Sequence, residues 1–151
     1  MILLRSDVAL KELSKLQTAG LAVAAILYVA AGTLHFVKPE AYLRIMPPYI
    51  PWHRQMVLIS GISEILGGVG LLVPAIRRRA AWGLIALLIA VFPANIYMAT
   101  NPIEAGAVNI PAVLRWGRLP LQLLLVWWLL WCTRTGCDLE PTGDRIKIAR
   151  D

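Results

Sequence analysis

The sequence predicts an all-α membrane protein, a four-helix transmembrane bundle with both termini in the cytoplasm. Of its 151 residues, 58% are hydrophobic and only 16% are charged, whereas a soluble domain carries about 25% charged residues. The apolar residues are concentrated in four long runs that are almost free of charge. The distribution of lysine and arginine between the connections predicts the orientation.

Each run is long enough, or nearly so, to cross the hydrocarbon core, which takes roughly 20 residues of α-helix. We place the spans at about 17–37, 55–76, 80–100 and 113–133. The fourth reaches this length only if Val113–Arg118 forms its first turns. The runs are continuous rather than alternating, which argues against the strands of a barrel. The first run is longer than the apolar core of a cleaved signal peptide, so we expect it to be an anchor.

The remainder of the chain is short, and we expect no globular domain outside the bilayer. We predict a cytoplasmic amphipathic lead-in over residues 1–16, the four-helix membrane domain over residues 17–133, and a cytoplasmic tail over residues 134–151. Cys132 and Cys137 lie at the end of the fourth span and lack the C-x-x-C spacing. We interpret them as incidental thiols, and their role stays open.

The basic residues indicate which side of the membrane each connection occupies. Ten of the fifteen lie in the N-terminal tail, the link at Arg77–Arg79 and the C-terminal tail, and five lie on the other side. The side richer in lysine and arginine is the cytoplasmic one. Because these residues flank apolar spans, the net charge of +6 does not indicate nucleic-acid binding. We expect a multi-pass protein in contact with the lipid bilayer of a cell membrane, in bacteria the inner membrane.

The connection over residues 38–54 is rich in proline. Pro39 followed by Glu40 suits the first turn of a short helix, and the later prolines stop that helix. Two interpretations are equally open. The connection is either an outer lid on the bundle or an ordinary interfacial segment, with Tyr49 and Trp52 in the aromatic belt.

Polar side chains inside the spans are the main functional signal, because such groups are costly in a membrane and usually face the bundle interior. With a rise of about 1.5 Å per residue, one group of them falls in the outer half of the bundle. It comprises His35, Glu64, Asn95, Arg118 and Gln122. We predict that these side chains line a polar pocket that binds a ligand.

Structural alternatives to ligand binding stay open for each residue. We expect Glu64 and Arg118 to form an ion pair, which either holds two helices together or binds a ligand. Asn95 and Gln122 are more typical of interhelical hydrogen bonds, and His35 suits a wet interface. No metal-binding motif is present, we predict no metal site, and no catalytic residue can be assigned.

Four motifs of the sequence resemble the DoxX-like integral membrane proteins. They are Gly32–Phe36 with the prolines that follow, Ser60–Glu64 with Gly67 and Gly68, Phe92–Ile96, and Arg118–Gln122. They occur in order within residues 17–133. The resemblance implies a four-helix membrane protein, linked in some members to quinone-coupled sulfur oxidation or to membrane oxidoreductase complexes. The sequence lacks the C-x-x-C of the related vitamin K enzyme, so thiol chemistry is not carried over.

Two functions therefore stay open, and a purely structural role stays open beside them. The first is a subunit or accessory of a membrane redox system, whose pocket holds a quinone or supports an oxidoreductase partner. The alternative is a non-catalytic binding or transport module for a small amphipathic molecule or lipid. No cofactor motif is evident, and a quinone is the one cofactor that the resemblance allows. Nothing in the sequence demands catalysis.

The orientation can be tested by labelling single cysteines on intact cells with a membrane-impermeant reagent. In a variant without Cys132 and Cys137, a cysteine at position 40 should be labelled and one at position 145 should not, because the basic residues place these positions on opposite sides. Labelling at 145 but not at 40 would show that the orientation is inverted.

Overall fold

The computed structural model describes residues 13–101, 104–105, 108–109 and 111–134. Most of the expected lead-in, Cys137 and the tail after residue 134 lie outside the described residues. The elements are α1 (Lys15–Val37), α2 (Pro39–Leu43), α3 (His53–Leu72), α4 (Arg77–Thr100), β1 (Glu104–Ala105), β2 (Val108–Asn109) and α5 (Ala112–Thr133). The four long helices are apolar and long enough to span a membrane. The predicted four-helix fold class and the multi-pass membrane location are thereby confirmed.

Local sequence signals account for the ends of these helices. Ser14 and Gln17 form a capping box at the start of α1, and Pro39 occupies the first turn of α2. The apolar run of the second span continues to residue 76, but α3 ends at Leu72. Its cap residue Val73 is extended, with ψ 109°, as expected for a residue that precedes a proline.

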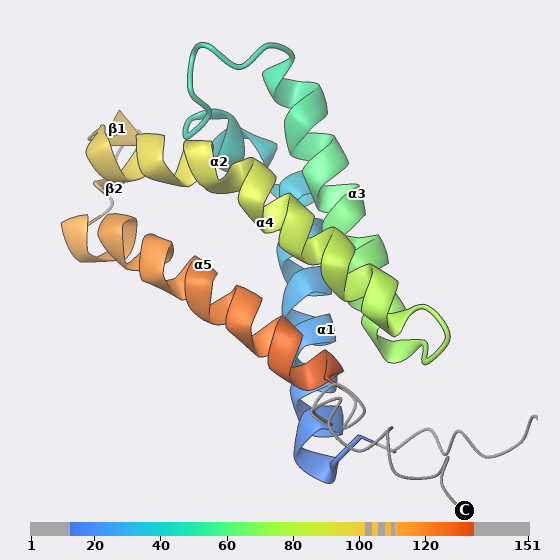
Figure 1. The fold of residues 1–151 in the computed structure, drawn as a ribbon. Coiled ribbons are helices and arrows are strands. Elements are labelled where there is room, and N and C mark those ends of the chain that lie inside the picture. The colour runs from blue at the N-terminus through green and yellow to red at the C-terminus, as the bar shows by residue number, and fades with distance from the viewer. Residues whose placement is uncertain (1–12, 102–103, 106–107, 110, 135–151) are drawn as a thin grey trace, which may run out of the picture.

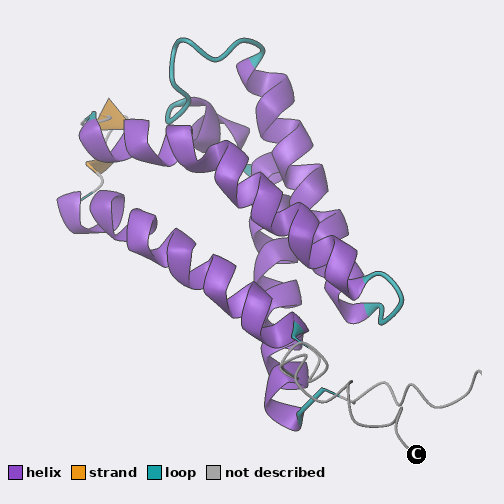
Figure 2. Ribbon diagram, in the orientation of Figure 1, coloured by secondary structure: helices purple, strands orange, loops and turns teal. Residues whose placement is uncertain are grey.

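The four long helices form a ring in which each contacts two neighbours (Figure 1). The order around the ring is α1, α3, α4 and α5, and α5 contacts α1 again. The short helix α2 lies against α1 and α3 at one end of the bundle. Between α4 and α5, β1 and β2 form a small antiparallel pair (Figure 2), with Glu104 opposite Asn109.

The core of the bundle receives side chains from all four long helices. Its buried cluster consists of Leu21, Ala24, Tyr28, Leu71, Ala81, Leu84, Ile85, Leu129 and Cys132. Large apolar side chains such as Ile26, Leu66 and Leu123 are exposed on the outside. In a bilayer this outer surface faces lipid chains, so its exposure carries no hydrophobic cost.

The backbones of α1 and α3 approach each other closely at two glycines. A Cβ atom at Gly32 would lie 2.6 Å from the carbonyl oxygen of Gly61, and one at Gly61 would lie 2.7 Å from the Cβ of His35. Two turns further along α3, a Cβ at Gly68 would lie 3.0 Å from the carbonyl oxygen of Ala25. Small residues of this kind permit the close packing that holds helices together in lipid.

Replacing Gly32 with alanine should therefore destabilise the bundle. We expect a loss of about 1–3 kcal/mol, as for other overpacked sites, because the obstructing atom is a backbone oxygen. Gly83→Ala is the matched control, since nothing lies within 4 Å of its Cβ position. That change should stabilise α4 by up to about 1 kcal/mol. Unfolding in detergent micelles measures both, and equal effects would contradict the close contact.

Candidate functional site

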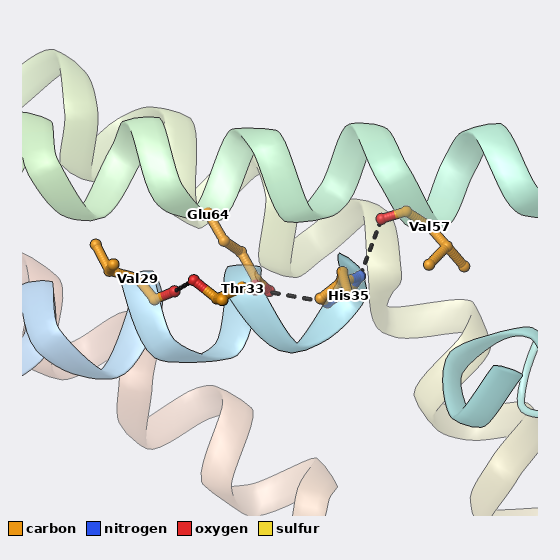
Figure 3. Close-up of polar contacts among 5 residues, drawn as sticks. All are labelled: Val29, Thr33, His35, Val57 and Glu64. Atoms are coloured by element: carbon orange, nitrogen blue, oxygen red, sulfur yellow. Dashed lines mark hydrogen bonds and ion pairs between the residues drawn. The ribbon is translucent and has the colours of Figure 1, made fainter. Parts of the chain in front are cut away.

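His35 lies in the last turn of α1, with only 8% of its surface exposed. Its Nδ1 atom is 2.9 Å from the carbonyl oxygen of Val57 on α3. A carbonyl oxygen can only accept a hydrogen bond, so Nδ1 carries the hydrogen and donates it. This bond fixes the tautomer and the orientation of the imidazole (Figure 3).

The other ring nitrogen of His35 faces Glu64 of α3. Nε2 lies 3.5 Å from Glu64 Oε2, and Oε2 is buried without a hydrogen-bond partner among the described residues. Nearby Thr33 donates its hydroxyl back to the carbonyl oxygen of Val29 at 2.7 Å (Figure 3). Nδ1 already carries a hydrogen. When the pair has no net charge, one further proton therefore resides either on Nε2, with both groups charged, or on Oε2, with both groups neutral.

Tyr42 of α2 packs against the His35 member of this pair. Its ring stacks on the imidazole of His35, with the centroids 3.8 Å apart and an interplanar angle of 25°. Burial raises the pKa of the Tyr42 phenol, the charge of Glu64 raises it further, and the charge of Arg118 lowers it. The phenol therefore lies within the electrostatic field of both charges.

The segment after α2 is packed against the start of α3. Pro47 is fully buried, and its carbonyl oxygen accepts a hydrogen bond from His53 Nε2 at 2.9 Å. Trp52 caps α3 in the left-handed region, with φ 53°. Together with the stacking of Tyr42, this packing favours the first interpretation of residues 38–54, and we call α2 and residues 44–52 the lid.

Asn95 and Gln122 form a second polar group, between α4 and α5. Asn95 Nδ2 donates to Gln122 Oε1 at 2.8 Å, and Gln122 Nε2 donates to the carbonyl oxygen of Leu88 at 2.6 Å. Pro93 lacks the N–H that would bond the carbonyl oxygen of Ile89, so the helical bonding of α4 is interrupted next to Leu88. The two amides thus connect the helices and satisfy each other.

The expected ion pair of Glu64 with Arg118 is not formed. In the described part of the chain the ion-pair partner of Glu64 is His35, and Arg118 is an exposed residue of α5. The ring order explains the difference, because the neighbours of α3 are α1 and α4. Helix α5 meets α1 at its other end, where Gln17 Nε2 donates to the carbonyl oxygen of Trp131 at 3.0 Å.

The structure thus joins His35 with Glu64 and Asn95 with Gln122, and it leaves Arg118 outside both groups. Sequence reasoning missed the contributions of Tyr42 and of the Val57 carbonyl. Helical spacing placed Tyr28 on the same face of the first span as Gly32 and His35, but the predicted pocket did not include it. Tyr28 is 7% exposed, and its hydroxyl has no hydrogen-bond partner among the described residues. The Val57 carbonyl could not have been found in this way, because a backbone carbonyl leaves no signal in the sequence.

The residues described do not provide a metal centre. Within them, no group of three or more histidine, cysteine, aspartate or glutamate side chains is arranged to hold a metal ion. Cys132 is buried, and its Sγ atom lies 2.7 Å from the Cβ position of Gly20. Its thiol therefore packs between α5 and α1.

Double-mutant cycles should distinguish the observed pair from the expected one. His35→Gln and Glu64→Gln should be non-additive in stability by about 1 kcal/mol, because each change leaves the other buried group without its partner. Arg118→Gln and Glu64→Gln should add to within about 0.5 kcal/mol. Unfolding in detergent provides the measurement. Coupling of Arg118 rather than His35 to Glu64 would contradict the geometry.

Comparisons with known proteins bear on the family alone. No curated protein and no solved structure matches the sequence. The pattern of one family, described as a domain of unknown function (DUF8561), matches residues 24–133. This range includes both polar groups, the lid, α1 from residue 24 onward, and the whole of α3, α4 and α5. The chain therefore belongs to the DUF8561 family of uncharacterised domains.

Proposed function

We propose that this membrane protein binds the head group of a quinone at the lid end of α1 and α3, as a subunit or accessory of a membrane redox system. The observation that carries the proposal is the pair of His35 and Glu64. It lies within two membrane-spanning helices, with side chains only 10% and 18% exposed. Ionisable groups at such positions are costly, and they commonly mark ligand or proton sites.

A purely structural role accounts poorly for the geometry of this pair. Charge-assisted hydrogen bonds are usually about 2.7–2.9 Å long, whereas Nε2 and Oε2 are 3.5 Å apart. Buried polar atoms are normally hydrogen-bonded, yet Oε2 has no such partner among the described residues. Burial of the pair therefore costs free energy that no strong hydrogen bond between the two side chains offsets. A ligand with polar oxygen atoms would complete its hydrogen bonding.

The surroundings of the pair favour a flat, amphipathic ligand. The rings of Tyr42 and His35 are stacked at the lid end, and Phe36, the chain neighbour of His35 on α1, is an exposed apolar side chain. An isoprenoid tail could lie along this apolar surface within the bilayer. The DoxX-like resemblance of the motifs around His35 and Glu64 supports a quinone-linked role over other amphipathic ligands.

Purification followed by mass spectrometry of the bound small molecules tests the proposal directly. We expect a quinone to be retained by the wild-type protein. We also expect Glu64→Gln to weaken binding of decylubiquinol, the reduced form of decylubiquinone, by at least about tenfold, which corresponds to about 1.4 kcal/mol. Glu40→Gln is the control, because it makes the same change at an exposed carboxylate and should alter neither result.

Two outcomes would count against the proposal. Recovery of a lipid or another amphipathic molecule in place of a quinone would favour the alternative of a binding or transport module. Equal binding by wild type, Glu64→Gln and Glu40→Gln would show that the pair does not contact the ligand. Thermal unfolding of each variant would establish that the protein is folded in both cases.

A further inference from the structure

We infer that the ligand of this site is a hydrogen-bond donor, so that the hydroxyl form of the couple, the quinol, binds more tightly than the carbonyl form, the quinone. The inference rests on the proposed function and specifies which form the site selects. It follows from three features: the bond between His35 and Val57, the geometry of Glu64, and the unpartnered hydroxyl of Tyr28.

The His35–Val57 bond determines what Glu64 can offer to a ligand. With the hydrogen of Nδ1 committed to Val57, the proton of the pair resides either on His35 Nε2 or on Glu64 Oε2. In the first state the carboxyl group is a carboxylate, whose two oxygens only accept hydrogen bonds. In the second state Oε1 is the carbonyl oxygen of a carboxylic acid, and it again only accepts. Oε1 is thus an acceptor in both states.

The remaining arrangement, with the proton on Oε1, is disfavoured. It would place the lone pairs of Oε2 and Nε2 opposite each other at 3.5 Å, inside a membrane span where repulsion between acceptors is weakly screened. Glu64 therefore has no favourable state in which it donates to a ligand from Oε1. A carbonyl group that approaches this oxygen would find a second acceptor.

Tyr28 supplies the complementary group on α1. Its hydroxyl has no hydrogen-bond partner among the described residues, and the residue is only 7% exposed. Tyr28 is one turn from Gly32, whose Cβ position is 3.0 Å from the Cβ of Glu64. Tyr28 and His35 thus flank the point at which Glu64 faces α1.

A hydroxyl group is the ligand that satisfies both residues. It can donate its hydrogen to Glu64 and accept one from the Tyr28 phenol. A carbonyl oxygen can accept from Tyr28 but offers Glu64 nothing. A site that leaves one of its buried polar groups unpaired discriminates strongly against the ligand responsible. The quinol should therefore be the form that is bound.

Equilibrium dialysis of the full-length wild-type protein in detergent, under anaerobic conditions, tests the inference. Decylubiquinol should bind at least about tenfold more tightly than decylubiquinone, because the quinone forgoes the hydrogen bond to Glu64. Equal affinities, or tighter binding of the quinone, would overturn the inference and leave the proposed function intact. Binding of neither probe would defeat the proposed function as well.

Two variants, each with a matched control, identify the residues responsible. Glu64→Gln introduces a carboxamide that can donate as well as accept, so the ratio of the two affinities should fall close to one, whereas Glu40→Gln should preserve it. Tyr28→Phe should weaken both forms, because both accept from the phenol. Tyr49→Phe, at a phenol that is 69% exposed, should change neither. A preference that survives Glu64→Gln would overturn the inference.

Discussion

At Gly32 and Gly61 the backbones of α1 and α3 lie so close that a Cβ on either glycine would come within 3 Å of the carbonyl oxygen of the other. Lipid chains are as apolar as leucine, so helices in a membrane are held by close packing and by hydrogen bonds rather than by burial from water. This contact brings the end of α1 against the first turns of α3. Only then can His35 reach the carbonyl oxygen of Val57 and face Glu64.

The two polar groups of the bundle differ in how completely their hydrogen bonds are satisfied. Between α4 and α5, Gln122 both accepts from Asn95 and donates to the backbone of Leu88. Between α1 and α3, Glu64 Oε2 has no hydrogen-bond partner among the described residues. A closed network in a low-dielectric interior stabilises its helices, whereas an incomplete one carries a cost. The first group is therefore suited to holding helices, and the second to receiving a ligand.

Hydropathy and helical periodicity predicted four helices and the height of each polar residue along its helix, because both depend on local spacing alone. They did not predict lateral neighbours. Glu64 and Arg118 both fall in the predicted outer half of the bundle, but the ring order places α1 rather than α5 beside α3, and His35 is the partner of Glu64. The role of Tyr42 depends on the path of the lid, and that of Val57 on a backbone atom, so neither follows from residue type.

The geometry also assigns different tasks to the two members of the pair. The Nδ1 atom of His35 is bonded to Val57, one face of its ring is covered by Tyr42, and its Nε2 edge faces Glu64. Little of the imidazole remains for a ligand to contact. Glu64 keeps a second carboxyl oxygen and the larger exposed fraction of the two side chains, 18% against 10%. His35 is therefore a positioning residue that holds or releases the shared proton, and through that proton it keeps Glu64 an acceptor toward whatever binds.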